Sequence, residues 1–184
     1  MTLPTAVRTS VVAGCVAISA CGTSLSQSAP TAPAEAGTHA APESFAEFRD
    51  RLETAALAIM NGDSRSWEEL YSHAPDATLF GGWGGHEKGW AELAPRWQMV
   101  RGRYREGTFR IDRISEHITD DLAVTVEIWR GDAAFSDGSS GPIGLRITHV
   151  CRREQGHWRL VHRHADTQLR LLPIQSHIQP PEAT

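Results

Sequence analysis

Apolar residues recur along this chain with two different periods, and the change of period separates a helical half from a strand-rich half. After Ser44, large apolar side chains return at helical spacing, and Glu47 stands at the position that a capping box requires. This pattern predicts a first helix that ends at Asn61-Gly62. The apolar face of this helix consists of Phe45, Phe48, Leu52, Ala56 and Ile59.

Two further helices are predicted before the strand-rich half begins. Asp63 or Ser64 can cap a short second helix that Pro75 ends. A third helix is predicted over residues 87–100, with a kink at Pro95 because proline removes a backbone donor. The apolar residues of the two helices are Trp67, Leu70 and Tyr71 in the second, and Trp90, Leu93 and Trp97 in the third.

The remaining elements are predicted as strands because apolar and polar residues alternate with a period of two. Residues 77–80 form a short strand, and the glycine-rich loop 81–85 allows another strand or a ligand to approach its backbone closely. Strands follow in residues 103–114 and 122–130. The second of these separates Leu122, Val124, Val126 and Ile128 from Thr125, Glu127 and Trp129.

A turn over residues 136–142 leads into a hairpin over residues 145–166, which carries most of the candidate chemistry. With a three-residue loop at 154–156, Arg153 faces His157, and the period of two then sorts the side chains into two faces. One face holds Arg146, Thr148, Val150, Trp158, Leu160, His162 and His164. The other holds Ile147, His149, Cys151, Arg159, Val161 and Arg163. The first face is polar at the end far from the turn, which is typical of a pocket floor.

Helices followed by an antiparallel meander predict an α+β fold with a helical layer packed on one face of the sheet. The chain has 184 residues, enough for one domain with a full core. The formal net charge is −4, so there is no global basic signal for nucleic acid or anionic lipid.

The N-terminus is typical of a bacterial export signal. Arg8 precedes the short apolar run 11–20, and the small residues before Cys21 resemble a lipobox, in which the cysteine carries lipid. We therefore expect a signal peptide over 1–20 and a lipid on Cys21, which would anchor an exported protein to a bacterial membrane. An ordinary signal peptide or a buried apolar segment are the alternatives.

Three further expectations follow for the parts around the domain and for its cysteine. Residues 21–43 are rich in small and polar residues and predict a flexible tether, whereas the domain covers 44–172 and a proline-rich tail covers 173–184. Cys151 would be the one cysteine of the mature domain, and we expect a small buried apolar residue there.

The order of elements and the hairpin resemble the nuclear transport factor 2-like superfamily, in particular its SnoaL-like and ketosteroid-isomerase-like branch. The hairpin is also similar to that of the calcium/calmodulin-dependent kinase association domain. The shared features are an arginine like Arg146, the pair Arg152-Arg153, Trp158 and an ending with Val161, His162 and His164, in which the residue between the two histidines varies. The resemblance covers residues 44–168. It implies a cone-shaped α+β barrel with a curved, mostly antiparallel sheet, a small apolar molecule in the cone, no cofactor, and a homodimer formed through the outer face of the sheet.

Proton transfer is the chemistry that the hairpin favours. His162 and His164 are the candidate acid/base pair, because histidine titrates near neutral pH, and Asp166 or Glu127 would orient one of them. The alternative is that these residues close the end of the sheet through bonds to the backbone. No metal is expected, since the spacing supplies no third ligand at a defined distance. Tyr71, Asp76 and Asp132 do not match the tyrosine and two aspartates of ketosteroid isomerase.

The candidate substrate-binding residues surround this pair. Arg146 on an interior face would need either Glu127 as an ion-pair partner or a carboxylate or enolate oxygen of a ligand. Trp83 and Trp129 are expected at the cavity mouth, and Tyr71 could stabilise a developing oxygen charge. Trp97 and Thr148 complete the predicted binding set.

Three functions remain open at this point. The first is a cofactor-free isomerase, dehydratase or hydrolase that acts on a small apolar substrate. The second is a lipid-tethered module that binds a ligand without changing it. The third is an assembly domain whose purpose is dimerisation.

Overall fold

The computed structural model describes residues 42–171 and residue 173, and all elements below lie in the compact unit Ala40–Thr184. The predicted signal peptide, Cys21, the tether up to residue 41 and most of the predicted tail fall outside the described residues. Three helices occur within the described part: α1 (Phe45–Met60), α2 (Arg65–Leu70) and α3 (Trp90–Arg103). None of the described helices is long and apolar enough to cross a membrane.

Helix α1 begins as its sequence predicts. The Ser44 side chain accepts a hydrogen bond from the Glu47 backbone, and the Glu47 side chain accepts one from the Ser44 backbone. Helix α3 begins at Trp90 rather than at residue 87. The reason is Gly89, whose φ of 77° is incompatible with a helix, and the pairing of residues 86–88 as a strand.

Six strands form one curved sheet in the order β2-β1-β6-β5-β4-β3. Their bounds are β1 (Thr78–Phe80), β2 (His86–Lys88), β3 (Tyr104–Ile118), β4 (Leu122–Phe135), β5 (Ser140–Glu154) and β6 (His157–Asp166). Strands β3 to β6 form the predicted antiparallel meander, whereas β1 pairs with β6 in parallel. Strand β4 runs five residues further than predicted, so the turn before β5 is shorter than residues 136–142.

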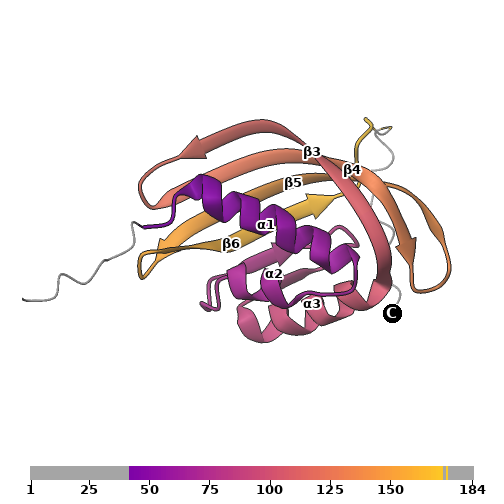
Figure 1. The fold of residues 1–184 in the computed structure, drawn as a ribbon, viewed down its shortest axis with the longest axis horizontal. Helices are drawn as coiled ribbons and strands as arrows, with labels where there is room; N and C mark the ends of the chain where they lie inside the picture. Colours follow the sequence, from indigo (N-terminus) through magenta and orange to yellow (C-terminus); the bar gives the residue numbers. More distant parts are fainter. Residues whose placement is uncertain (1–41, 172, 174–184) are drawn as a thin grey trace, which may run out of the picture. The chain divides into compact units, whose positions relative to one another are not determined.

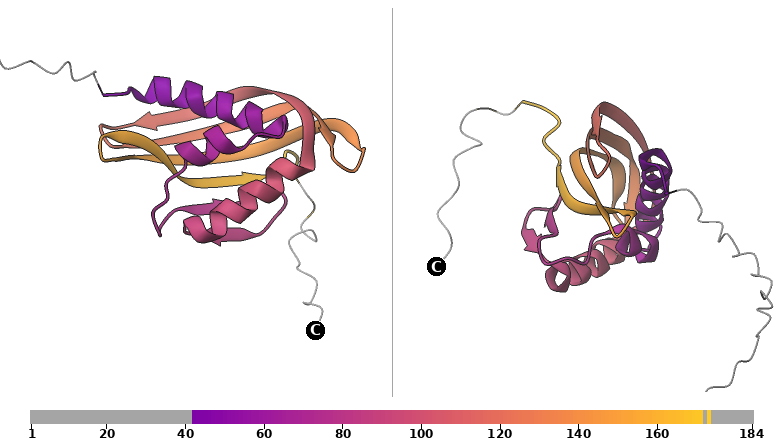
Figure 2. Two further views of the ribbon diagram at one scale, coloured as in Figure 1. Left: turned by 60° about the horizontal axis from the view of Figure 1, so that its bottom comes forward. Right: turned by 90° about the vertical axis from the view of Figure 1, so that its left-hand side faces the viewer.

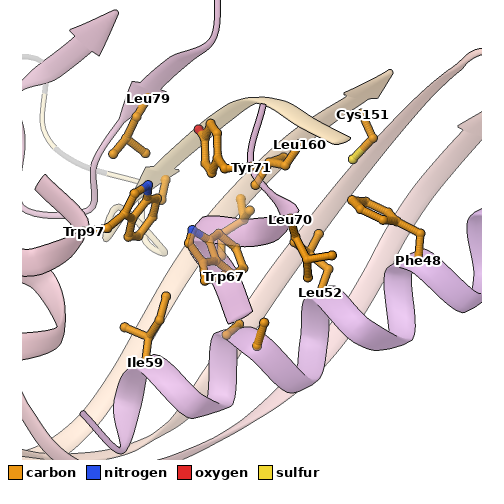
Figure 3. Packing of buried hydrophobic residues seen from close by; sticks show 14 of the residues in the cluster. Phe48, Leu52, Ile59, Trp67, Leu70, Tyr71, Leu79, Trp97, Cys151 and Leu160 are labelled. Carbon is orange, nitrogen blue, oxygen red and sulfur yellow. The ribbon is translucent and has the colours of Figure 1, made fainter. Parts of the chain in front are cut away.

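The three helices cover one face of this sheet, which we call the inner face, and the opposite side is the outer face (Figures 1 and 2). Helix α1 lies along the sheet over β3, and α3 lies beside the short strands β1 and β2. The core between the layers is rich in aromatic rings (Figure 3). Each large apolar side chain buried there stabilises the fold by roughly 1.5–3 kcal/mol. The fold is therefore the predicted α+β architecture.

The hairpin β5–β6 differs from its predicted register in two places. Glu154 pairs with His157, so the loop has only two residues, Gln155 and Gly156, with φ values of 52° and 86°. Further along, Cys151 pairs with Leu160 but Val150 pairs with His162, which leaves Val161 as an extra residue in β6.

This bulge corrects the predicted faces, because one extra residue exchanges the two sides of a strand. The inner face carries Trp158 and Leu160 before the bulge, and Arg163 and Ala165 after it. The polar residues at the far end do share a face, but it is the outer face. These residues are Arg146, Thr148, His162, His164 and Asp166.

Candidate functional site: an aromatic cavity around Arg163

A cavity of about 390 Å³ lies between the helices and the inner face of the sheet. Its buried end is formed by Trp67, Trp97 and Arg163, and its mouth by the exposed Trp83 and by Leu169. Further lining residues include Ile59, Leu79, Val100, Tyr104, Phe109, Trp129, Ile143 and Leu145. Cavities of this size suit a small organic molecule.

Aromatic rings from four elements make the walls of the cavity. Trp67 of α2 meets Trp97 of α3 edge to face, with ring centroids 5.2 Å apart (Figure 3). Opposite, Phe109 of β3 stacks on Trp129 of β4, with centroids 4.5 Å apart. Such contacts fix the ring positions, so the cavity is held open by the same packing that stabilises the core.

The glycine-rich loop after β1 forms one side of the mouth. A Cβ atom added to Gly82 would lie 3.0 Å from the Leu145 side chain, so glycine permits the close approach that the sequence predicts. In the same loop, Trp83 lies 5.4 Å from the Tyr104 ring and beneath the Arg103 guanidinium, which is 4.9 Å from the Trp83 ring centre. Trp83 is therefore placed at the mouth, as predicted.

Arg163 is the charged group at the buried end. Its side chain comes from β6 just after the bulge, and only 8% of the residue is exposed. Burial lowers the pKa of Arg163 to about 10, so the group remains a cation at neutral pH. The guanidinium lies 5.6 Å from the ring centre of Trp129 and 5.9 Å from that of Trp67.

His149 lies beside Arg163 on the inner face, because the two residues pair across β5 and β6. Burial lowers the pKa of His149 well below its ordinary value, and the positive charge of Arg163 acts in the same direction. His149 is therefore neutral at physiological pH. Its Nε2 has no hydrogen-bond partner among the described residues.

Glu127 lies on the inner face of β4, behind the cavity wall. Its Oε2 accepts a hydrogen bond of 2.7 Å from the Trp129 indole, and the Arg113 guanidinium lies 3.8 Å from its Oε1. Arg113 also bonds Glu53 of α1, and burial raises the pKa of Glu53. Glu127 thus belongs to an ion network under α1 and orients Trp129, but it does not line the cavity.

The predicted acid/base residues do not face this cavity. His162, His164 and Asp166 lie on the outer face, so the prediction that they line the interior is wrong. The cause is the bulge at Val161. The His162 Nδ1 is 2.8 Å from the Thr78 hydroxyl, and burial lowers the pKa of His162. His164 and Asp166 border an open groove beside Phe80.

Arg146 and Thr148 also lie on the outer face, which corrects their predicted place in an interior pocket. Arg146 donates two hydrogen bonds of 2.9 Å to Asp166, which was neither of its two predicted partners, Glu127 and a ligand oxygen, and these bonds lower the pKa of Asp166. In the strand register Glu127 stands opposite Ile147, and its side chain is on the inner face, away from Arg146. The charge of Arg146 is therefore neutralised within the protein.

The predicted aromatic residues are placed more nearly as expected. Trp83, Trp97 and Trp129 line the cavity, although Trp129 is buried in its wall rather than placed at the mouth. Tyr71 is buried in the core, and its hydroxyl donates to the Thr78 carbonyl at 2.7 Å. Burial raises the pKa of Tyr71, so its proton is held in that bond.

Sequence reasoning missed Arg163 and His149, and it assigned Trp67 to the core alone. The signal in the sequence was weak. Trp158 and Leu160 mark the apolar face of β6, and a strictly alternating strand would place the polar His162 on the same face. This mismatch indicates that the alternation is interrupted between Leu160 and His162. Cys151, in contrast, is fully buried and free, as expected. Among the described residues, no cluster of three or more His, Cys, Asp or Glu side chains is arranged to hold a metal ion.

Comparison with solved structures supports the fold. A nuclear transport factor 2-like protein from Salmonella enterica is 20% identical, with a TM-score of 0.55, over 66% of this chain and 92% of that one. A proposed dehydratase of the same family from Streptomyces avermitilis is 17% identical, with a TM-score of 0.57, over 68% and 97%. A proposed calcium/calmodulin-dependent kinase association domain from Thiobacillus denitrificans is 19% identical, with a TM-score of 0.53, over 66% and 93%.

No curated protein sequence matches the chain. The SnoaL-like domain model, however, matches residues 49–166, which is more than half of the sequence and includes every strand of the sheet. The chain therefore belongs to the SnoaL-like domain family, and its fold is that of the nuclear transport factor 2-like structures.

Proposed function

We propose that this domain binds a small, largely apolar molecule in the cavity between its helices and its sheet. The observation that carries the proposal is the cavity of about 390 Å³, which has an aromatic wall and a mouth at Trp83. Apolar walls with a few polar groups are typical of ligand sites. The rings are already in contact with one another, so binding would require little reordering.

Binding is favoured over acid/base catalysis because of the polar groups that reach the cavity. Arg163 and Tyr104 are hydrogen-bond donors at neutral pH, whereas His162, His164 and Asp166 lie on the other face of the sheet. Two structural neighbours are named as a proposed dehydratase and a proposed aromatic ring hydroxylase. Cofactor-free isomerisation, dehydration or hydrolysis in the same cavity is therefore the alternative function.

Binding of the neutral fluorescent dye Prodan tests this proposal. We expect a blue shift of its emission and a stoichiometry of one dye per domain. Leu145→Trp should weaken binding, since Leu145 lines the cavity and a larger ring would fill it. The control is Leu57→Trp, which adds the same ring at an exposed position of α1. Absent or non-saturable binding to the unaltered domain would reject the proposal.

We also propose that the protein is exported and anchored to a bacterial membrane by lipid on Cys21. Support comes from the sequence alone: a basic residue, a short apolar run and small residues before the cysteine. Fractionation of expressing cells should find the full chain with the membranes and Cys21→Ser in the soluble fraction. Equal distribution of the two proteins would reject the anchor.

A homodimer formed through the outer face of the sheet is a third proposal. The helices cover only the inner face, and Val124, Val126, Ile128 and Val150 project from the outer face, where each is half-buried. A second copy would cover these side chains.

A further inference from the structure

Arg163 differs from the other arginines that are largely buried in the described part of the chain. Arg49 has Glu116 at 2.9 Å, Arg96 has Glu87 at 3.5 Å, and Arg113 bonds Glu53. No described carboxylate lies within 4.0 Å of the Arg163 guanidinium, and its Nε has no hydrogen-bond partner there. Glu127 attracts it only at longer range.

An unpaired buried cation is costly, because water no longer solvates its charge. The two tryptophans beside Arg163 offset part of this cost through cation–π contacts. A tryptophan ring face, however, supplies no oxygen acceptor for the N–H donors of the guanidinium. The donors of Arg163 therefore remain to be satisfied by something in the cavity.

Two indole N–H groups lie within the packed wall at the same end of the cavity. The indole Nε1 atoms of Trp67 and Trp97 are buried, and neither has an acceptor among the described residues. Both residues line the cavity together with Arg163 (Figure 3 shows the two rings beside each other). Packing closes these two atoms off from the cavity, so the tryptophan rings line it and the guanidinium of Arg163 is the donor that a ligand can reach.

We propose that the ligand is a small monocarboxylate with an apolar body, and that Arg163 binds its carboxylate at the buried end of the cavity. The inference rests on the proposed function, since it concerns the same cavity. The planar fork of Arg163 matches the two oxygens of a carboxylate. The apolar body lies toward Tyr104 and Leu145.

One negative charge suits this site better than two. Arg163 supplies a single positive charge, and a phosphate dianion would leave one charge uncompensated in an apolar cavity. The anion also has to leave water on entry, but the desolvation of Arg163 has already occurred in the free protein. The site is therefore preorganised for a monoanion.

The test compares cinnamate with cinnamyl alcohol, which share an apolar body and differ in charge. Titration calorimetry should show that the unaltered domain binds cinnamate at least about 10-fold more tightly than the alcohol, as expected for a charge-assisted pair. Arg163→Met should remove this preference while retaining the binding of the alcohol and of Prodan. Arg146→Met is the matched control: its charge is paired with Asp166 on the outer face, so the preference should persist.

Two further measurements make the outcome independent of one variant. Arg163→Lys keeps the charge and should retain part of the preference. Cinnamyl phosphate should bind more weakly than cinnamate, and tighter binding of the phosphate would overturn the monocarboxylate assignment. If Prodan binds but the unaltered domain does not prefer cinnamate, the carboxylate inference fails and the proposed binding function stands. If Prodan does not bind either, the proposed function fails as well.

Discussion

Three buried polar residues on the inner face differ in how their charges and hydrogen-bonding groups are satisfied. Glu127, His149 and Arg163 are all buried on the inner face, on three neighbouring strands. Glu127 is satisfied by Trp129 and Arg113, and His149 avoids a charge by remaining neutral. Only Arg163 keeps a charge without a near partner among the described residues, and it lies at the buried end of the cavity.

The neutral state of His149 predicts that acid destabilises the fold. The pKa of His149 is near 6.5 when the chain is unfolded and lower when it is folded, so below pH 6.5 the unfolded state binds the extra proton. The free energy of unfolding should therefore fall by about 1 kcal/mol between pH 7.5 and pH 5.5 through this residue alone. Urea unfolding at both pH values measures the change.

His149→Leu should reduce this pH dependence, because the residue then has no proton to bind. His157→Leu is the control, since His157 is exposed at the hairpin turn and should leave the dependence as it is. Burial also lowers the pKa of His162, so some dependence of the same sign should remain in His149→Leu. An unchanged dependence in that variant would contradict the assignment.

Among the elements, those with strong local sequence signals were predicted correctly, whereas features that depend on strand pairing were not. The capping box at Ser44 and the apolar repeat of α1 are local, so the helix follows from a few residues. The start of α3 and the strand at residues 86–88 depend on the backbone of Gly89 and on pairing with β1. The bulge at Val161 depends on the fit between two long strands, which no local pattern encodes.

The turn of the β5–β6 hairpin gives a prediction at this scale. Both of its residues have positive φ, a conformation that suits asparagine and glycine better than glutamine. Gln155→Asn should therefore stabilise the domain by about 0.5 kcal/mol, and Gln155→Val should destabilise it by about 1–2 kcal/mol. Urea unfolding followed by tryptophan fluorescence measures both. Equal stability of the three proteins would be inconsistent with this turn.

For the whole molecule, the sequence was enough to predict the fold but not the cavity. The order of elements and the hairpin residues indicated a SnoaL-like domain, and the family match and the structural neighbours agree. The cavity required knowledge of which residues face inward, and one extra residue in β6 reversed that assignment for His162 and His164. Trp83, Trp97 and Trp129 were found because large aromatic side chains in loops and amphipathic elements tend to line interior space.

The proposed homodimer gives a prediction about the whole molecule. Size-exclusion chromatography with light scattering should give the mass of two domains for the unaltered protein. Val126→Lys should give one domain, because it places a charge among the apolar side chains of Val124, Ile128 and Val150 on the outer face. Leu57→Lys places the same charge on the exposed side of α1 and should remain a dimer. A single-domain mass for the unaltered protein at tens of micromolar would exclude pairing.

The bulge at Val161 also separates two properties that lie side by side in the sequence. After it, Arg163 belongs to the cavity, whereas His162 and His164 belong to the outer surface. If the cavity binds a ligand as proposed, substitutions at consecutive codons alter either the ligand site or the outer surface of the sheet, and seldom both. Selection could then change the proposed ligand binding and the outer surface independently, within a stretch of three residues.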